Sequence, residues 1–124
     1  MKWKMHLPER PFRAIINGTK KVEGRVSSKE DDRYGKIKAG DEIVFELEPG
    51  NESLNTKVNF IHHYSDVRSM LETEGVKNVL SSGGNIEQGV ESYHSIPHYK
   101  ENVKKYGIYA IGVTPLKNSE NSSI

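Results

Sequence analysis

Alternation of apolar and polar residues is the feature that most constrains the fold of this chain. Trp3, Met5 and Leu7 alternate with polar residues, which is the period-two pattern of a half-buried strand. Further strands are predicted at residues 20–26, 43–47, 57–64 and 108–113. Because regular helical crossovers do not separate these strands, the pattern predicts an antiparallel, barrel-like sheet, which the similar first and last strands could close by pairing.

Helical periodicity appears once near the start of the chain and repeatedly in its second half. Phe12, Ile15 and Ile16 follow Pro11 at helical spacing, and Asn17-Gly18 then supplies a stop signal. Later helices are predicted to begin near Ser65, Asn85 and Pro97. The predicted class is therefore α+β, with helices flanking the sheet on one side.

The length and composition of the chain limit its organisation. Its 124 residues suit one domain, predicted to span residues 1–116, and the polar segment 117–124 is expected to be a disordered tail. At this size, folding buries about two-thirds of the surface that the unfolded chain exposes. The absence of cysteine excludes disulfides and thiolate metal sites.

The charge balance and the lack of long apolar segments narrow the expected partners. With 18 Lys plus Arg against 17 Asp plus Glu, a strongly basic surface for long duplexes is not expected, and contact with nucleic acid would be a local cluster that reads a short strand or one base. No apolar run approaches the roughly 20 residues that cross a bilayer. Residues 1–6 lack a secretory signal, so a cytoplasmic protein without membrane contact is expected.

One eight-residue motif carries the functional interpretation. Residues 18–25 read Gly-Thr-Lys-Lys-Val-Glu-Gly-Arg and match the pattern Gly-x-Lys-x-x-Glu-x-Arg. This motif resembles the signature of ASCH domains, which are similar to the RNA-binding PUA fold. The preceding helix, Ala-Gly-Asp-Glu-Ile-Val-Phe at 39–45 and Lys-Tyr-Gly-Ile-Tyr-Ala-Ile at 105–111 agree in order. The resemblance implies a PUA-like β-barrel with flanking helices and a cleft lined by the signature, in a family proposed to bind RNA.

The signature residues suit a polar ligand that has both donors and acceptors. Lys20 offers a point charge with three donors, and Arg25 a planar fork for a phosphate or a base. Glu23 can accept protons from an amine or a hydroxyl, or hold the two cations in place. The predicted ligand-binding residues are Gly18, Lys20, Glu23, Arg25 and Tyr93, and the predicted partner is RNA or a nucleoside derivative.

The spacing of these residues requires a particular backbone. In a regular strand Lys20 would point away from Glu23 and Arg25, because the spacings of three and five are odd. The three side chains share a cleft only if Lys20 lies on a turn that follows Gly18-Thr19. The alternative is an exposed strand with cross-strand ion pairs, which contribute little energy.

Catalysis by the same cleft is the alternative function. The resemblance extends to members that hydrolyse N4-acetylcytidine and to members reported to cut RNA. In such a reaction, Lys20 with a lowered pKa would activate water and Glu23 would relay the proton. Those amidohydrolases carry threonine where this chain has Glu23. They also use a carboxylate after the central strands, and Glu72, Glu74 and Glu87 are the candidates here, none of which the sequence singles out.

Several other residues are candidate ligands. His94 and His98 have the spacing of a zinc pair, but Pro97 between them disfavours a shared helix face, so neither a metal nor a cofactor is expected. Tyr93 is the best candidate for stacking on a base, whereas the helical spacing of Tyr99 and Tyr106 favours a place in the core. A third interpretation is an interaction domain that uses its helical flank and contacts no nucleic acid.

Overall fold

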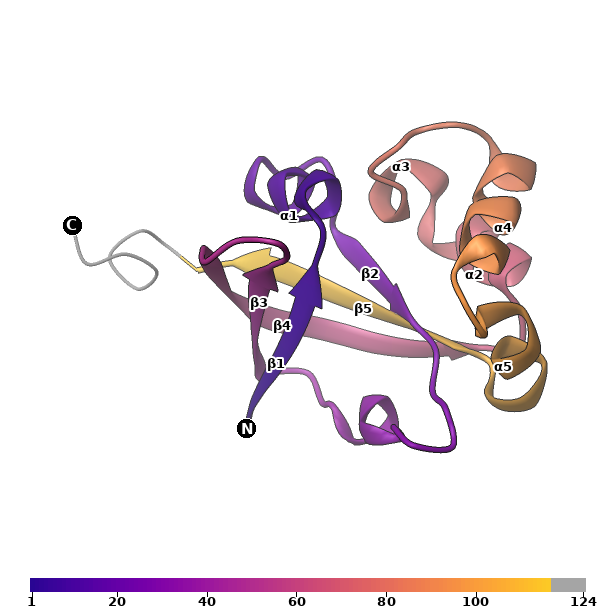
Figure 1. Cartoon of the computed structure of the whole chain (residues 1–124), viewed down its shortest axis with the longest axis horizontal. Helices are drawn as coiled ribbons and strands as arrows, with labels where there is room; N and C mark the ends of the chain where they lie inside the picture. The colour runs from indigo at the N-terminus through magenta and orange to yellow at the C-terminus, as the bar shows by residue number, and fades with distance from the viewer. Residues whose placement is uncertain (117–124) are drawn as a thin grey trace.

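The computed structural model describes residues 1–116 as one sheet with helices beside it (Figure 1). Its elements, in chain order, are β1 (Lys2–Leu7), α1 (Glu9–Ile16), β2 (Val22–Arg25), the 3₁₀ turn η1 (Arg33–Lys36), β3 (Glu42–Leu47), β4 (Ser53–Tyr64), α2 (Val67–Glu74), α3 (Val76–Val79), α4 (Ile86–Ser95), α5 (Tyr99–Tyr106) and β5 (Ile108–Pro115). The tail predicted at 117–124 lies outside the described residues. Within 1–116, no helix has the length and apolarity needed to cross a membrane.

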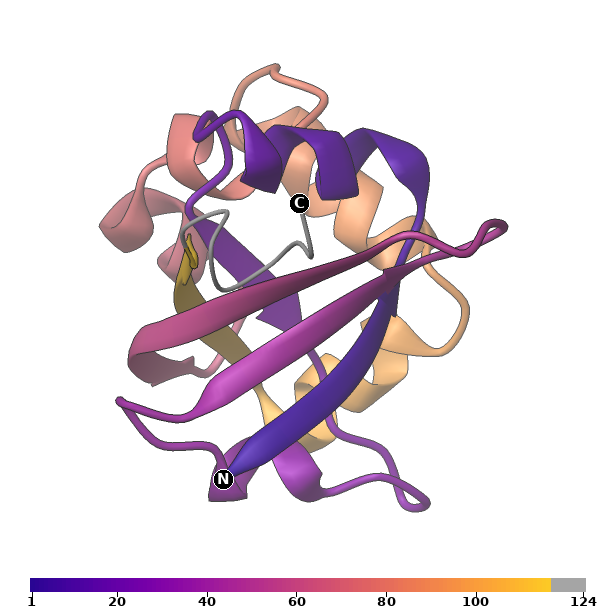
Figure 2. The same ribbon diagram turned by 90° about the vertical axis from the view of Figure 1, so that its left-hand side faces the viewer.

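The five strands form a curled sheet in the order β1-β3-β4-β5-β2 (Figure 2). β1 and β3 are parallel, and the other neighbouring pairs are antiparallel, so the sheet is mixed. The α+β class predicted from the sequence is confirmed. The first and last strands do not pair with each other, because β3 occupies the paired side of β1 while β5 lies between β4 and β2. The two edges of the sheet are therefore β1 and β2.

Two hydrophobic clusters hold the helices against the sheet. In the first, Phe12 and Ile15 of α1 pack with residues of β1, β3 and β4. In the second, residues of α2, α3, α4 and α5 pack on β2 and β5. The interior strand β5 contributes to both clusters, with Ile111 in the first and Ile108 in the second, which is why its sequence is a nearly continuous apolar run. The helices thus flank the sheet in two groups rather than on one side.

The helix starts show where local sequence signals succeeded and failed. Asn85 caps α4 in a full capping box with Gln88, as predicted. The cap of α2 is Asp66, whose side chain accepts from the backbone N–H of Ser69, and not the predicted Ser65. The last helix begins after His98 rather than at Pro97, because His98 adopts a left-handed φ of 69° that interrupts the helix.

Candidate functional site

Lys20 lies on a turn between α1 and β2. Gly18 has a φ of 83°, which favours glycine, and the backbone N–H groups of Thr19 and Lys20 both donate to the carbonyl of Ala14. The regular strand starts only at Val22. Lys20 therefore precedes the regular alternation of the strand, and its side chain points to the same side as that of Glu23.

The ammonium of Lys20 is buried and surrounded by acceptors. The residue is 4% exposed, and Nζ donates to the carbonyl of Val22 at 2.8 Å and to the carbonyl of Val79 at the end of α3. The same Nζ is 3.3 Å from Oε1 of Glu23. Each of the three N–H bonds of the ammonium thus has an acceptor.

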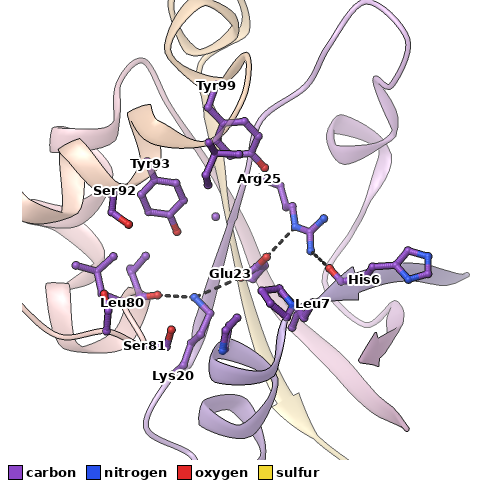
Figure 3. Close-up of a pocket in the computed structure, with 16 residues that line it drawn as sticks. His6, Leu7, Lys20, Glu23, Arg25, Leu80, Ser81, Ser92, Tyr93 and Tyr99 are labelled. Atoms are coloured by element: carbon purple, nitrogen blue, oxygen red, sulfur yellow. Dashed lines mark hydrogen bonds and ion pairs between the residues drawn. The ribbon is translucent and has the colours of Figure 1, made fainter. Parts of the chain in front are cut away.

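Glu23 and Arg25 extend these contacts into a charged network between the two edge strands of the sheet. Their spacing of two places both side chains on one side of β2. Nε of Arg25 donates to Oε2 of Glu23 at 2.8 Å, and Nη2 of Arg25 donates to the backbone carbonyl of His6 at 2.8 Å (Figure 3). The Lys20–Glu23–Arg25 network therefore links α3, edge strand β2 and edge strand β1.

Burial and pairing act against each other in this network. Burial raises the pKa of Glu23, but the charges of Lys20 and Arg25 outweigh it and leave that pKa below its ordinary value. For Lys20, burial prevails over the attraction of Glu23 and lowers the pKa. Burial also lowers the pKa of Arg25, yet Glu23 raises it further, so the guanidinium stays charged. Glu23 is accordingly an ionised acceptor between two cationic donors.

The network forms the floor of a pocket of about 340 Å³, called here the β2 pocket. It opens between the β1–α1 connection, β2, the α3–α4 loop and the start of α5. Its walls combine apolar side chains with hydroxyl groups, among them Leu7, Leu80, Ile96, Tyr99, Ser81 and Ser92. A small apolar hollow with a few fixed polar groups is the usual form of a small-molecule site.

Gly24 lets α4 approach β2 closely. A Cβ at this position would lie 2.5 Å from the hydroxyl oxygen of Tyr93, so only glycine fits without displacement. Burial strongly raises the pKa of Tyr93 and keeps its hydroxyl neutral. Gly24 is not among the predicted site residues, although a glycine inside a strand is a signal of close approach by another group.

The ring of Tyr93 faces another ring rather than open space. Tyr93 is 8% exposed, and its ring is parallel to that of Tyr99, with 6.4 Å between centroids. Its hydroxyl, and not its ring face, is therefore what points toward the pocket (Figure 3). Tyr99, expected in the core, also lines the β2 pocket and is less buried than Tyr93.

The predicted ligand-binding residues are thus divided between two places. Lys20, Glu23, Arg25 and Tyr93 line the β2 pocket. Gly18 does not. It lines a second hollow beside the end of β5, which Lys20 also lines, and its contribution to the β2 pocket is the turn that precedes Lys20.

The three candidate catalytic carboxylates all lie outside the β2 pocket. The side chain of Glu74 is 8% exposed and contacts Nδ1 of His62 at 2.6 Å and the hydroxyl of Tyr64. Burial and Glu74 raise the pKa of Tyr64 to about 12. Glu87 pairs with Arg68 on the surface, and Glu72 is exposed. Glu74 therefore fastens α2 to β4.

The histidine pair does not form a chelate in the structure. His94 belongs to α4, whereas His98 precedes α5 and lies 3.6 Å from Glu101. In the described part of the chain, no group of three or more His, Cys, Asp or Glu residues has an arrangement that could hold a metal ion.

Comparison with known proteins places these features in a family. The ASCH domain model matches residues 5–117. The crystal structure of the hypothetical protein PH0355 is similar with 42% identity and a TM-score of 0.80, covering 94% of this chain and 100% of that one. The solution NMR structure of protein PF0455 from Pyrococcus furiosus is 36% identical with a TM-score of 0.67, covering 94% and 99%. A search of curated proteins gave no match.

Proposed function

Because this chain belongs to the ASCH domain family, we propose that it is a binding module that holds RNA or a modified nucleoside in the β2 pocket. The observation that carries this proposal is the buried Lys20–Glu23–Arg25 network at the floor of a hollow with apolar walls. A volume of about 340 Å³ lies near the lower end of small-molecule sites. That size favours one base or nucleoside over a duplex.

The polar groups of the pocket suit such a ligand. Arg25 uses Nε and Nη2 for Glu23 and His6, and within residues 1–116 its Nη1 has no protein acceptor. This group is available for a phosphate or a base carbonyl. The half-buried ring of Tyr99 supplies an apolar surface beside it. The pocket thus offers a donor for a phosphate or a carbonyl and an apolar surface for a flat base.

Catalysis is the alternative, as an amidohydrolase on acylated cytidine or a ribonuclease. The lowered pKa of Lys20 is what favours it. Against it, the three acceptors around Nζ stabilise the protonated amine and leave no lone pair directed at a substrate. Glu23 also stands where the amidohydrolases of the family are understood to carry threonine. These features favour binding over hydrolysis.

A thermal-shift screen over nucleosides, nucleotides and short RNAs tests the binding proposal. A native-state ligand raises the melting temperature by mass action. Arg25→Ala should weaken binding about tenfold or more by removing a charge-assisted contact, and RNA binding should also fall with added salt. Failure of every nucleoside, nucleotide and RNA to bind would contradict the proposal.

Arg33→Ala is the matched control for Arg25→Ala. Nη1 of Arg33 donates to the backbone carbonyl of Lys4 on β1 at 2.8 Å, just as Arg25 donates to that of His6. Both variants therefore lose one contact to the same sheet edge, but only Arg25 lines the β2 pocket. Equal affinity in the two variants would place the ligand elsewhere.

Incubation with N4-acetylcytidine and with RNA separates the alternative from the main proposal. Product formation that is lost in Lys20→Ala and kept in Lys21→Ala would support hydrolysis. Lys21 is adjacent in sequence, exposed and outside the β2 pocket, so it controls for the loss of a nearby positive charge.

A further inference from the structure

The carboxylate of Glu23 has unused acceptor capacity in the β2 pocket. Its Oε1 is paired with Lys20 and its Oε2 with Arg25. A carboxylate has about four lone-pair sites, so about one site remains on each oxygen. The side chain is 9% exposed and lines the pocket, which means that a group entering the pocket can reach the remaining sites.

The two cations fix the direction in which these oxygens face. Lys20 and Arg25 lie on opposite sides of Glu23 (Figure 3), and each contacts a different oxygen. The carboxylate is therefore clamped from both flanks, with its two oxygens presented together. The floor thus presents two adjacent acceptors.

This pair of acceptors selects among the bases. The Watson–Crick edge of guanine has an imino N–H and an amino group side by side, followed by the O6 acceptor. Two N–H donors in that arrangement bind a carboxylate bidentately. Cytosine and adenine offer a single amino group next to a ring acceptor, and uracil flanks its single N–H with two carbonyls, each of which would repel a Glu23 oxygen.

We propose that the β2 pocket recognises a guanine-type edge, with its two N–H donors on Glu23. This inference rests on the proposed function, since it specifies which base the same pocket takes. The aromatic wall at Tyr99 and the apolar side chains of Leu80 and Ile96 enclose the ring, while Glu23 reads its edge.

A titration of the full chain with matched nucleosides tests this inference. Calorimetry at about 0.15 M salt compares guanosine with inosine, which lacks only the amino group, and with 1-methylguanosine, adenosine, cytidine and uridine. Guanosine should bind about tenfold more tightly than inosine, the usual effect of one lost hydrogen bond to a charged group. 1-Methylguanosine should bind as weakly as uridine, because the methyl group replaces the imino proton.

Glu23→Gln is the complementary change in the protein. It replaces one of the two acceptors by a donor, so the ratio of guanosine to inosine affinity should fall toward one. If this variant fails to fold, the nucleoside series on the unchanged protein still decides, because that series alters the ligand alone. Short RNAs of one sequence with guanosine or inosine at a single position extend the comparison to a strand.

The outcomes separate the two proposals. Guanosine above inosine and 1-methylguanosine supports the guanine edge. Equal binding of guanosine and inosine, or a preference for cytidine or uridine, overturns it and leaves nucleoside binding intact. No binding of any nucleoside or RNA overturns both.

Discussion

Two carboxylates of this chain each pair with an arginine, but in opposite surroundings. Glu23 is 9% exposed and lies 2.8 Å from Arg25. Glu52 is 52% exposed and lies 2.5 Å from Arg13, with a second contact at 2.9 Å. The surface pair therefore has the shorter and more complete geometry. Water and salt screen it, whereas the buried pair is shielded, so distance alone does not rank the two.

The pKa values of the two carboxylates make the same point. The hydrogen bond from Arg13 lowers the pKa of Glu52. The pKa of Glu23 is also lowered, but against the opposing effect of burial. An equal direction of shift thus arises from a modest interaction at the surface and from a strong one in the network. Breaking each pair measures the difference.

Glu23→Ala should have the largest effect on stability. Removing the carboxylate leaves Lys20 and Arg25 buried without their counter-ion, which costs about 3–5 kcal/mol in such settings. Urea unfolding of the wild type and the variant gives the difference in free energy of unfolding.

Glu52→Ala is the matched control. It also removes a carboxylate from an arginine, and its unfolding midpoint should equal that of the wild type within error, because Arg13 then returns to water. Similar losses in the two variants would show that burial is not what distinguishes the pairs.

Gly24→Ala should destabilise the protein by a smaller amount than Glu23→Ala. The added methyl group meets the hydroxyl oxygen of Tyr93 at 2.5 Å and two ring carbons at 2.9 and 3.0 Å, and overpacking of this kind costs about 1–3 kcal/mol. Adding Tyr93→Phe should restore part of the loss, because it removes the nearest atom but keeps the ring. A double-mutant cycle from urea unfolding measures this coupling. Independent, additive effects would mean that the chain relaxes away from Tyr93.

The acid stability of the chain tests the charge state of Glu23. Because folding lowers the pKa of Glu23 from its ordinary value of 4.5, the contribution of its ionised form is complete above about pH 4.5 and is lost as the pH falls through the lowered value. The free energy of unfolding of the wild type relative to Glu23→Gln should therefore shrink below that pH. A difference that stays constant down to about pH 3 would mean that folding does not lower the pKa of Glu23.

For the part of the site that residues 18–25 build, local signals in the sequence were enough to predict the backbone. The odd spacing of Lys20 and Glu23 required a turn, and Gly18 supplies it with a φ of 83°. The alternation of Ile43 and Phe45 likewise gave a strand with the correct buried face. In each case the deciding interactions lie within a few residues of one another, where pattern and backbone preference suffice.

The remaining parts of the site depend on contacts between distant segments. The carbonyl of Val79 reaches Lys20 across 59 positions, and that of His6 reaches Arg25 across 19. Every residue type carries a backbone carbonyl, so the sequence gives no signal for either contact. Tyr93 was expected to offer its ring, but the packing of α4 against α5 turned the ring toward Tyr99, a tertiary effect that helical spacing does not report.

The smallest expected effect belongs to the surface arginine itself. Arg13→Met keeps an aliphatic stem beside the ring of Phe12, over which the guanidinium now lies at 5.4 Å, and removes only the charge. Its unfolding midpoint in urea should match that of the wild type, and any small difference at low salt should disappear as salt is added, because the exposed partners are screened. Arg25→Met should instead remain destabilised at every salt concentration, since its pair with Glu23 is shielded from ions. A salt-independent loss in Arg13→Met would show that exposure is a poor guide to the strength of these pairs, and the contrast between Glu23 and Glu52 would then need another cause.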